Sequence, residues 1–587
     1  MGEQLYTRWG KQIESQEVLK EYPRPQMVRE SYECLNGFWD YAISVSKELP
    51  EKYDGIILVP FSPESVLSGV QRQLLPDEFL HYRKQIQVDE TILKNRLLLH
   101  FGAVDQFCRV YVNGESVGIH RGGYTPFEFD ITKKVRVGEN VLQVVVQDVS
   151  ETSYHTRGKQ KLERGGLFYT AQSGIWQTVW MEYVPDIYVE ALKMTPRYDE
   201  GALDLKVFTY KRVRAAVHAT VYYQGEHVLT TDFMANETTR ITIPDFCSWS
   251  PENPNLYDIH LEVGNDRIKS YFAMRKYSVE PDEKGILRYF LNNKPYFFHG
   301  VLDQGYWPDG LYTAPSDDAL IFDIESMKEL GFNTLRKHIK IESARWYYHC
   351  DRIGMAVWQD MMNGGAKYHW NFVCILPNFF SWAGRKVKDN KYHVFSRQDV
   401  DGRQEYYDEL YDMVKHLYNY PSVALWTPFN EGWGQFDAAK ATTMLRKLDR
   451  NRLIDEASGW YDQKGGDTYS IHNYWNRLRV RPKDRAIALT ECGGYAWHVE
   501  DHSFNEDFFG YRKFQDKESL TARYCRLMQQ EIIPNISRGL SAMIYTQLSD
   551  VEDEVNGFMT YDREILKMDK DKIIEINRQV LECFHQS

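Results

Sequence analysis

The chain has 587 residues, 43% of them hydrophobic, and a formal net charge of −12 at pH 7. That length is enough for about three or four domains, and the composition is ordinary for a globular protein. The acidic balance argues against nucleic acid or an anionic membrane as a partner, since both bind clustered Lys and Arg.

The cysteines and the N-terminal residues indicate the cellular compartment in which the protein is expected. Eight cysteines are scattered without a Cys-x-x-Cys pair or a Cys/His cluster, so neither a zinc site nor a disulfide framework is indicated. Residues 1–26 lack the apolar core of a signal peptide, and no apolar run approaches the length of a membrane span. We therefore predict a cytoplasmic protein with reduced thiols and no metal or other cofactor. Removal of a leader before the printed sequence begins stays open.

The first part of the chain, residues 1–185, has the pattern of a β-sandwich. Short apolar runs at residues 96–101, 109–112 and 141–146 are separated by glycine-rich turns such as Asn113-Gly114 and Gly122-Gly123. Residues 186–277 again alternate with period two, as in residues 216–222 and 257–263, and no cluster there suggests chemistry. We predict a second, smaller sandwich that acts as a spacer.

From residue 278 to residue 587 strands and helices alternate, as a parallel fold requires. We predict eight strands, the number of a (β/α)8 barrel, at Tyr296–Gly300, Asn333–Arg336, Met355–Gln359, Val423–Phe429, Leu453–Glu456, Tyr469–His472, Ala486–Glu491 and Ala542–Gln547. The aromatic-rich stretch Gly364–Val400 is too long for a plain connection, and we expect it to wall a pocket.

Two of these strands end in a glutamate followed by flexible backbone. Val423–Trp426 leads into Asn430-Glu431-Gly432, and Ala486–Thr490 leads into Glu491-Cys492-Gly493. In a parallel barrel the carboxyl ends of the strands form the catalytic face. Alone, Glu431 could be an acid that suits the dipole of the following helix, but two glutamates in the same setting fit a pair of facing carboxylates.

Paired carboxylates are what the hydrolysis of a glycosidic bond needs. One protonates the leaving oxygen, and the other stands on the opposite side of the sugar, about 5 Å away in retaining enzymes. Glu431 and Glu491 are 60 residues apart (491 − 431), so only a closed fold can bring them together. Asp455 and Glu456, at the end of the fifth predicted strand, are rival acids.

With these motifs the chain resembles glycoside hydrolase family 2, which includes β-galactosidases, β-glucuronidases and β-mannosidases. The resemblance covers nearly the whole length and implies an N-terminal jelly-roll (1–185), an immunoglobulin-like sandwich (186–277) and a (β/α)8 catalytic barrel (278–587). Asn430-Glu431 is similar to the family's acid/base motif, and Thr490-Glu491 to its nucleophile strand. The jelly-roll either binds sugar or supports the barrel, and one of its loops could border the active site.

The resemblance implies roles for individual residues. Glu491 is the expected nucleophile, Glu431 the acid/base, Asn430 a ligand of the sugar 2-hydroxyl, and Tyr474 a donor to the nucleophile. Arg336 would fix carboxylate geometry, while His338 is either a site residue or a structural histidine. Asp360 either binds a sugar hydroxyl or forms a salt bridge inside the barrel. The expected aromatic platforms for sugar rings are Trp460, Trp433, Trp497 and Tyr545.

Departures from the family pattern bear on the substrate. Glucuronidases carry an Asn-x-Lys motif that reads the sugar carboxylate, and Glu554 and Asn556 stand there in this chain. Those changes disfavour a glucuronide. The large bacterial β-galactosidases have a His three residues after the nucleophile, another His after the first barrel strand and metal ligands after the third. Here those positions are Gly494, Gln304, and Gly364 with Ala366, so neither galactose contacts nor a metal carry over.

We therefore expect a retaining, exo-acting β-glycosidase of neutral β-hexosides, with β-galactosidase activity first. A β-glucuronidase or another β-glycosidase of the family is the alternative. A non-catalytic carbohydrate-binding protein with a decayed barrel is the alternative of another class. The expected partner is a small carbohydrate substrate, and a homo-oligomer stays open.

Overall fold

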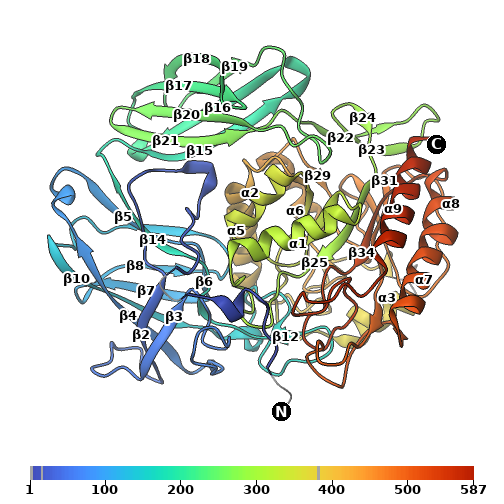
Figure 1. The fold of residues 1–587 in the computed structure, drawn as a ribbon, viewed down its shortest axis with the longest axis horizontal. Helices are drawn as coiled ribbons and strands as arrows, with labels where there is room; N and C mark the ends of the chain where they lie inside the picture. Colours follow the sequence, from blue (N-terminus) through green and yellow to red (C-terminus); the bar gives the residue numbers. More distant parts are fainter. Residues whose placement is uncertain (1–3, 15–16, 380–383, 587) are drawn as a thin grey trace.

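The computed structural model describes residues 4–14, 17–379 and 384–586. It consists of two β-sandwiches beside an α/β barrel, drawn in blue, green, and yellow to red (Figure 1). The multidomain architecture expected from the sequence is therefore confirmed.

The N-terminal sandwich consists of two antiparallel sheets. One has the order β3 (Gly55–Val59), β2 (Gly37–Ser44), β4 (Phe79–Val88), β10 (Gly138–Gln147), β7 (Phe107–Val112) and β8 (Glu115–Arg121). The other has the order β1 (Tyr32–Cys34), β14 (Val179–Val184), β5 (Arg96–Phe101) and β9 (Phe127–Asp130). Alternate residues of β10, including Leu142 and Val144, are fully buried in one core with Leu97 and Leu99 of β5. Apolar residues at every second position of the sequence thus mark the face of each strand that packs against the core.

The second sandwich is smaller. Its three-stranded sheet has the order β15 (Val189–Arg197), β16 (Ala202–Thr209) and β19 (Thr238–Thr242). The four-stranded sheet has the order β18 (Glu226–Met234), β17 (Ala216–Tyr223), β20 (Tyr257–Val263) and β21 (Asp266–Phe272). Val217, Ala219 and Val221 are buried between the sheets, whereas Ala216 and His218 are exposed. This unit lies above the other two in Figure 1.

All eight predicted barrel strands are present and parallel. Along the sheet they are β29 (Leu453–Ile454), β28 (Val423–Thr427), β27 (Ala356–Asp360), β26 (Thr334–Lys337), β25 (Phe298–Asp303), β34 (Leu540–Thr546), β31 (Ala486–Gly493) and β30 (Thr468–Asn473). The hydrogen-bonded order ends at β29 and β30, so among the described residues no ladder joins these two strands. We call the gap between them the seam.

Helices cover the outside of the barrel. They are α1 (Asp317–Glu329), α2 (Ala344–Ile353), α5 (Val400–Leu417), α6 (Ala438–Leu448), α7 (Lys517–Leu527), α8 (Ile533–Ile536) and α9 (Lys570–His585). The side chains of Ser316, Asp399, Asp516 and Asp569 accept backbone N–H groups at the starts of α1, α5, α7 and α9, which satisfies donors that a helix leaves free. A small sheet of β22 (Tyr277–Pro281), β23 (Leu287–Leu291) and β24 (Lys294–Pro295) supplies Tyr289, which packs with Phe298 and Trp358 of the strands.

The N-terminal sandwich is fixed against the barrel by an aromatic core. Tyr124, Tyr169 and Trp176 belong to the same buried cluster as Tyr306 and Tyr312 of the barrel. A segment that contains the short strands β11 (Gln160–Lys161) and β12 (Tyr169–Thr170) reaches across to the barrel loops. We call residues 157–170 the crossing loop.

Two further findings concern thiols and membranes. Each cysteine for which the structure gives a state is a free thiol. Among the described residues, no helix is long and apolar enough to cross a membrane.

Candidate active site

Glu431 is held just beyond the carboxyl end of β28. The strand is buried throughout, and the chain then passes through Pro428 and Phe429 to Asn430 and Glu431. Glu431 has a left-handed backbone with φ of 53°, and its N–H donates to the carbonyl of Ser458 at 3.0 Å. A non-glycine residue in this conformation stores strain that the surrounding structure must hold, as is common at functional sites.

Glu491 lies within β31, where the pairing with both neighbouring strands is irregular. The register shifts between Ile471 and His472 on one side and between Leu489 and Cys492 on the other. A bulge changes the direction in which a side chain points. The Thr490 hydroxyl contacts Ser470 Oγ at 2.5 Å, and the Glu491 carboxylate contacts Arg336, so both consecutive side chains point into the barrel.

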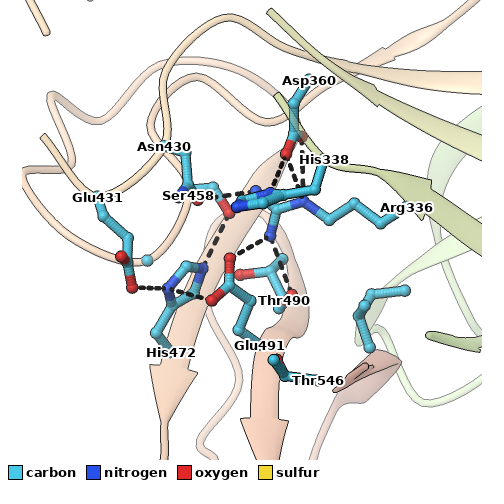
Figure 2. Close-up of polar contacts among 12 residues, drawn as sticks. Arg336, His338, Asp360, Asn430, Glu431, Ser458, His472, Thr490, Glu491 and Thr546 are labelled. Atoms are coloured by element: carbon cyan, nitrogen blue, oxygen red, sulfur yellow. Dashed lines mark hydrogen bonds and ion pairs between the residues drawn. The ribbon is translucent and has the colours of Figure 1, made fainter. Parts of the chain in front are cut away.

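The fold brings the two glutamates together around His472 (Figure 2). His472 Nδ1 lies 2.7 Å from Oε1 of Glu431 and 3.6 Å from Oε2 of Glu491. The ligand atoms of the three side chains all lie within 4.8 Å of one another. One oxygen of each carboxylate therefore lies within 4.8 Å of an oxygen of the other, close to the separation of about 5 Å in retaining enzymes and shorter than the separation in inverting enzymes.

Arg336 links the nucleophile candidate to its neighbours. Its Nη1 donates to Oε1 of Glu491 at 3.2 Å, its Nη2 to Oδ1 of Asn430 at 2.8 Å, and its Nε to Asp360 at 3.0 Å. Asp360 also faces His338 Nδ1 at 2.7 Å. The planar guanidinium therefore fixes three side chains from three strand ends in one arrangement.

Glu491 is an ionised carboxylate in this setting. Burial raises the pKa of its carboxyl, but the charges of His472 and Arg336 and the hydrogen bond from Tyr474 outweigh burial and hold the pKa at about 2. The Tyr474 hydroxyl donates to Oε2 of Glu491 at 2.5 Å, and burial together with that negative charge raises the pKa of Tyr474 well above its ordinary value. Tyr474 thus stays a donor while Glu491 stays charged.

Glu431 is the more open of the two acids. Its side chain is 14% exposed, against 5% for Glu491, and the indole N–H of Trp433 donates to its Oε2 at 3.2 Å. The Trp433 ring contacts Phe168 of the crossing loop, and Tyr368 and Trp370 of the long insertion, at centroid distances of 5.1 to 5.9 Å. An aromatic wall built from three parts of the chain therefore stands beside the proton-donor candidate.

Most predicted site residues meet here, with two exceptions. Trp460 packs edge-on against His472 at 5.9 Å, next to the pair. Tyr545, by contrast, is fully buried against Tyr524 of α7 and Phe558 in the core outside the strands, so it offers no face to a sugar. Trp497 lies on β32 (Tyr495–Trp497), partly buried against that same core. We therefore do not retain Tyr545 or Trp497 as stacking platforms.

The hydrogen bonds and ion pairs of Asp360, and the surroundings of the rival acids Asp455 and Glu456, bear on the roles that the sequence left open for them. Both oxygens of Asp360 are taken by Arg336 and His338, which is the salt-bridge role, and Asp360 is fully buried. Asp455 is buried as well, and burial raises its pKa to about 6. Glu456 accepts the N–H of Gly465 at 2.8 Å. Within the described residues, no hydrogen bond or ion pair joins either rival to Glu431.

Sequence reasoning missed His472, and it expected that a jelly-roll loop could border the active site without identifying the crossing loop. His472 stands two residues before Tyr474 at the end of a predicted strand, so period-two alternation carried a signal that both face the same side. Ser458 Oγ lies 3.1 Å from His472 Nε2 and holds the ring from the other side. Phe168 has no comparable signal, because its approach depends on how two domains pack. His472 and the two glutamates are also the one cluster of three possible metal ligands found among the described residues.

The loop after β34 lies near the same site. Oε1 of Glu554 accepts from the Asn556 side chain at 2.9 Å, and Oε2 accepts from the Tyr169 hydroxyl at 2.5 Å. Burial, followed by the charges of Glu431, Glu554 and Glu491, raises the pKa of Tyr511 well above its ordinary value. Since Tyr511 stacks on Tyr474 at 3.8 Å, Glu554 belongs to the surroundings of Glu431 and Glu491.

Comparisons with known proteins agree with this architecture. Family models match three successive parts of the chain: "Glycosyl hydrolases family 2, sugar binding domain" over residues 67–185, "Glycosyl hydrolases family 2" over 187–275, and "Glycosyl hydrolases family 2, TIM barrel domain" over 285–480.

Relatives carry two kinds of name. The chain is 25% identical over 444 residues to a β-galactosidase of Thermoanaerobacter pseudethanolicus, with 72% of this chain and 54% of that protein covered. It is 22% identical over 431 residues to a β-glucuronidase of Streptococcus agalactiae, with 70% and 68% covered. The chain thus spans about half the length of the first of these relatives.

Solved structures share the fold. A β-D-glucuronidase of Dictyoglomus thermophilum superposes with a TM-score of 0.73 at 17% identity, over 95% of this chain and 98% of that one. At that identity the likeness concerns the arrangement of the chain, not the sugar that it takes.

Proposed function

Because the chain belongs to glycoside hydrolase family 2, we propose that it hydrolyses β-glycosides with retention, through a covalent glycosyl-enzyme. The observation that supports this most directly is the carboxylate pair: Glu431 and Glu491 come from different strands, and their oxygens lie within 4.8 Å. Two carboxylates at that separation can flank the anomeric carbon of one sugar.

The proposed roles follow from the surroundings of each acid. Glu491, with a pKa of about 2, is ionised and oriented by Arg336 and Tyr474, and it attacks the anomeric carbon. Glu431, on the open side, protonates the leaving oxygen and then takes a proton from water. Once Glu491 is esterified it carries no charge, and Tyr474 is then free to donate to the sugar ring. Asn430, oriented by Arg336, keeps its amide N–H groups for the sugar 2-hydroxyl.

We propose an exo-acting enzyme of neutral β-hexosides, with β-galactosides first. The crossing loop supports exo action because it joins the loop after β34: Tyr169 donates to Glu554, and Arg164 pairs with Asp553 at 2.8 Å. These contacts hold the crossing loop against the loop after β34. Glu554 supports a neutral sugar, because a carboxylate near the catalytic pair repels a uronate.

A β-uronide is the second candidate, and one observation favours it. Burial lowers the pKa of His338 well below its ordinary value, and the charge of Lys159 in the crossing loop lowers it further, so a cation acts on a residue that contacts Asp360. No ion pair of Lys159 is found among the described residues. A cation in that place can bind a sugar carboxylate, and relatives named as β-glucuronidases fit this reading.

The test is hydrolysis of a panel of nitrophenyl β-glycosides that includes galactoside, glucoside, mannoside and glucuronide. We expect cleavage of a neutral hexoside with the β-anomer released first, as seen by proton NMR. Glu431→Gln and Glu491→Gln should each lose at least about 10³-fold in kcat/KM. Full activity in either variant refutes the assignment, and binding without turnover favours the decayed carbohydrate-binding barrel. We also propose a cytoplasmic location, and a homo-oligomer stays open.

A further inference from the structure

A pocket lies at the seam of the barrel, beside the catalytic pair. It has a volume of about 350 Å³ and is lined along one side by β30 and the chain that follows it. His472 and Tyr474, which contact Glu431 and Glu491, are among its lining residues. Neither glutamate lines the pocket itself, which follows β30 and the chain after it from these two contact residues.

The lining of this pocket is cationic. Five of its residues carry positive charge: Arg385, Arg477, Arg479, Arg481 and Lys483. Among the described residues that line it there is no aspartate or glutamate. The chain as a whole has a net charge of −12, so such a concentration of one sign is contrary to its average composition.

The local sequence explains why the charges face outward together. In residues 477–481 burial alternates as it does along an extended segment: Leu478 and Val480 are buried, whereas Arg477, Arg479 and Arg481 are exposed. Alternate side chains of an extended segment lie about 7 Å apart on one face. The backbone is anchored because Leu478 N–H donates to Glu531 and Val480 N–H donates to Asn535. The three arginines are thus presented by a fixed segment.

These cations form no close ion pairs in the described part of the chain, although the charge of Asp462 acts on Arg385 and opposes the lowering of its pKa by burial. No ion pair within 4.0 Å is found there for Arg477, Arg479, Arg481, Lys483 or Arg385. Arg385 and Lys483 instead stand over the ring of Tyr469, at 4.5 and 4.9 Å from its centroid. Arg485, by contrast, forms an ion pair with Asp462, as expected of an arginine with a structural role.

The pocket also offers aromatic surface of the kind that sugar rings stack on. Trp475 is 52% exposed, and Trp460 lies across the seam from it, with both among the lining residues. Aromatic faces bind the C–H faces of sugars, while guanidinium groups bind carboxylates and sulfates in paired hydrogen bonds. The combination fits a carbohydrate that carries negative charge, more closely than a nucleic acid or a membrane, which would need a broader basic surface.

We propose that the seam pocket binds the leaving-group part of the substrate, and that this part is an acidic sugar bearing a carboxylate or a sulfate. The inference rests on the proposed exo-glycosidase function: an exo enzyme holds one terminal sugar at the catalytic pair, so a pocket beside that pair receives what lies beyond the scissile bond. The terminal sugar itself is neutral, and the charge is on its neighbour.

The test uses disaccharides in which the hexose best cleaved in the nitrophenyl panel is β-linked to glucose, to glucuronic acid or to glucose 6-sulfate. We expect kcat/KM at low salt to be at least about 10-fold higher for one or both acidic disaccharides than for the neutral one. The two acidic probes distinguish carboxylate from sulfate. The preference should shrink to less than about 3-fold at 0.5 M NaCl, because salt screens exposed charges.

The decisive variant is Arg477→Gln combined with Arg479→Gln and Arg481→Gln, three exposed side chains whose loss should leave the fold intact. We expect its kcat/KM on the preferred acidic disaccharide to fall by about 10-fold, because three weak surface ion pairs together contribute about that much. Its activity on the nitrophenyl glycoside should not change. The matched control removes three exposed cations of the sandwiches: Lys94→Gln with Arg109→Gln and Arg214→Gln. It changes net charge equally and should behave as wild type.

Three outcomes overturn the inference. One is equal kcat/KM for neutral and acidic disaccharides in the wild type, and another is the same loss in both triple variants, which would indicate long-range attraction only. The third is cleavage of no glycoside at all, which overturns the proposed function as well. Hydrolysis without an acidic preference overturns the seam-pocket inference alone.

Discussion

Shortening Glu491 to aspartate keeps its charge and withdraws the carboxylate by one C–C bond, about 1.5 Å. In the structure Oε1 of Glu491 lies 3.2 Å from Arg336 Nη1, and Oε2 lies 2.5 Å from the Tyr474 hydroxyl oxygen. A withdrawal of that size lengthens both contacts to about 4 Å or more, beyond hydrogen-bond range. It also moves the attacking oxygen away from the anomeric carbon by the same amount.

The expected cost follows from that displacement. A misplacement of about 1 Å at a reacting atom costs about 10²-fold in rate. For Glu491→Asp we therefore expect kcat/KM to fall by about 10² to 10³-fold, which corresponds to about 3 to 4 kcal/mol of transition-state stabilisation. Because the charge is kept, the loss reports geometry and not the absence of a carboxylate.

The assay is steady-state hydrolysis of the best nitrophenyl glycoside, with circular dichroism to establish that the variants are folded. Glu456→Asp is the matched control, since it makes the same chemical change beyond the end of another barrel strand, β29, where the carboxylate accepts the Gly465 N–H. That control should stay within about 3-fold of wild type. A Glu491→Asp enzyme within 5-fold of wild type, or an equal loss in Glu456→Asp, would refute the assignment of the nucleophile.

Three further predictions concern the same surroundings. Tyr474→Phe removes the hydrogen bond to Glu491, so kcat should fall about 10 to 100-fold and the acid limb of the pH profile should move to higher pH, because the pKa of Glu491 rises. The depressed pKa of Glu491 stabilises the fold above pH 4.5, and that stability is lost as the pH falls toward 2. Between pH 5 and 3.5, urea unfolding of Glu491→Gln should therefore show about 1 kcal/mol less loss than wild type. Glu554→Asn combined with Asn556→Lys replaces a carboxylate by a cation, and nitrophenyl glucuronide hydrolysis should rise at least about 10-fold relative to the neutral hexoside; no change would show that this loop does not read the sugar.

The sequence was sufficient for the architecture because the strands carry their own pattern. Eight buried runs separated by helices predict a parallel barrel, and all eight are found within a few residues of the expected places. The same pattern placed Glu431 and Glu491 at strand ends on the catalytic face. Period-two alternation likewise separated the two sandwiches from the barrel, since burial of one strand face is written into every second residue.

The direction in which a single side chain near the site points could not be predicted from the same pattern. Tyr545 and Thr546 are neighbours on β34, yet Thr546 contacts Tyr474 while Tyr545 packs outward on Tyr524. A shift of one residue along a strand reverses the side to which the side chain points. The register between β31 and β34 shifts along the pair, and the amino-acid sequence does not predict where. The expectation for Tyr545 failed for this reason.

The sequence by itself therefore determined three things. These are the set of strands, the order in which strands and helices follow one another along the chain, and the two glutamates at the ends of two barrel strands. Only the tertiary structure decided that His472 stands between those acids, that the crossing loop brings Phe168 and Tyr169 to the barrel mouth, and that five cations face one pocket at the seam. The physical reason is range: alternation and turn chemistry act between near neighbours in the chain. Contacts between domains, and between the two ends of an incompletely closed sheet, depend on how finished elements pack.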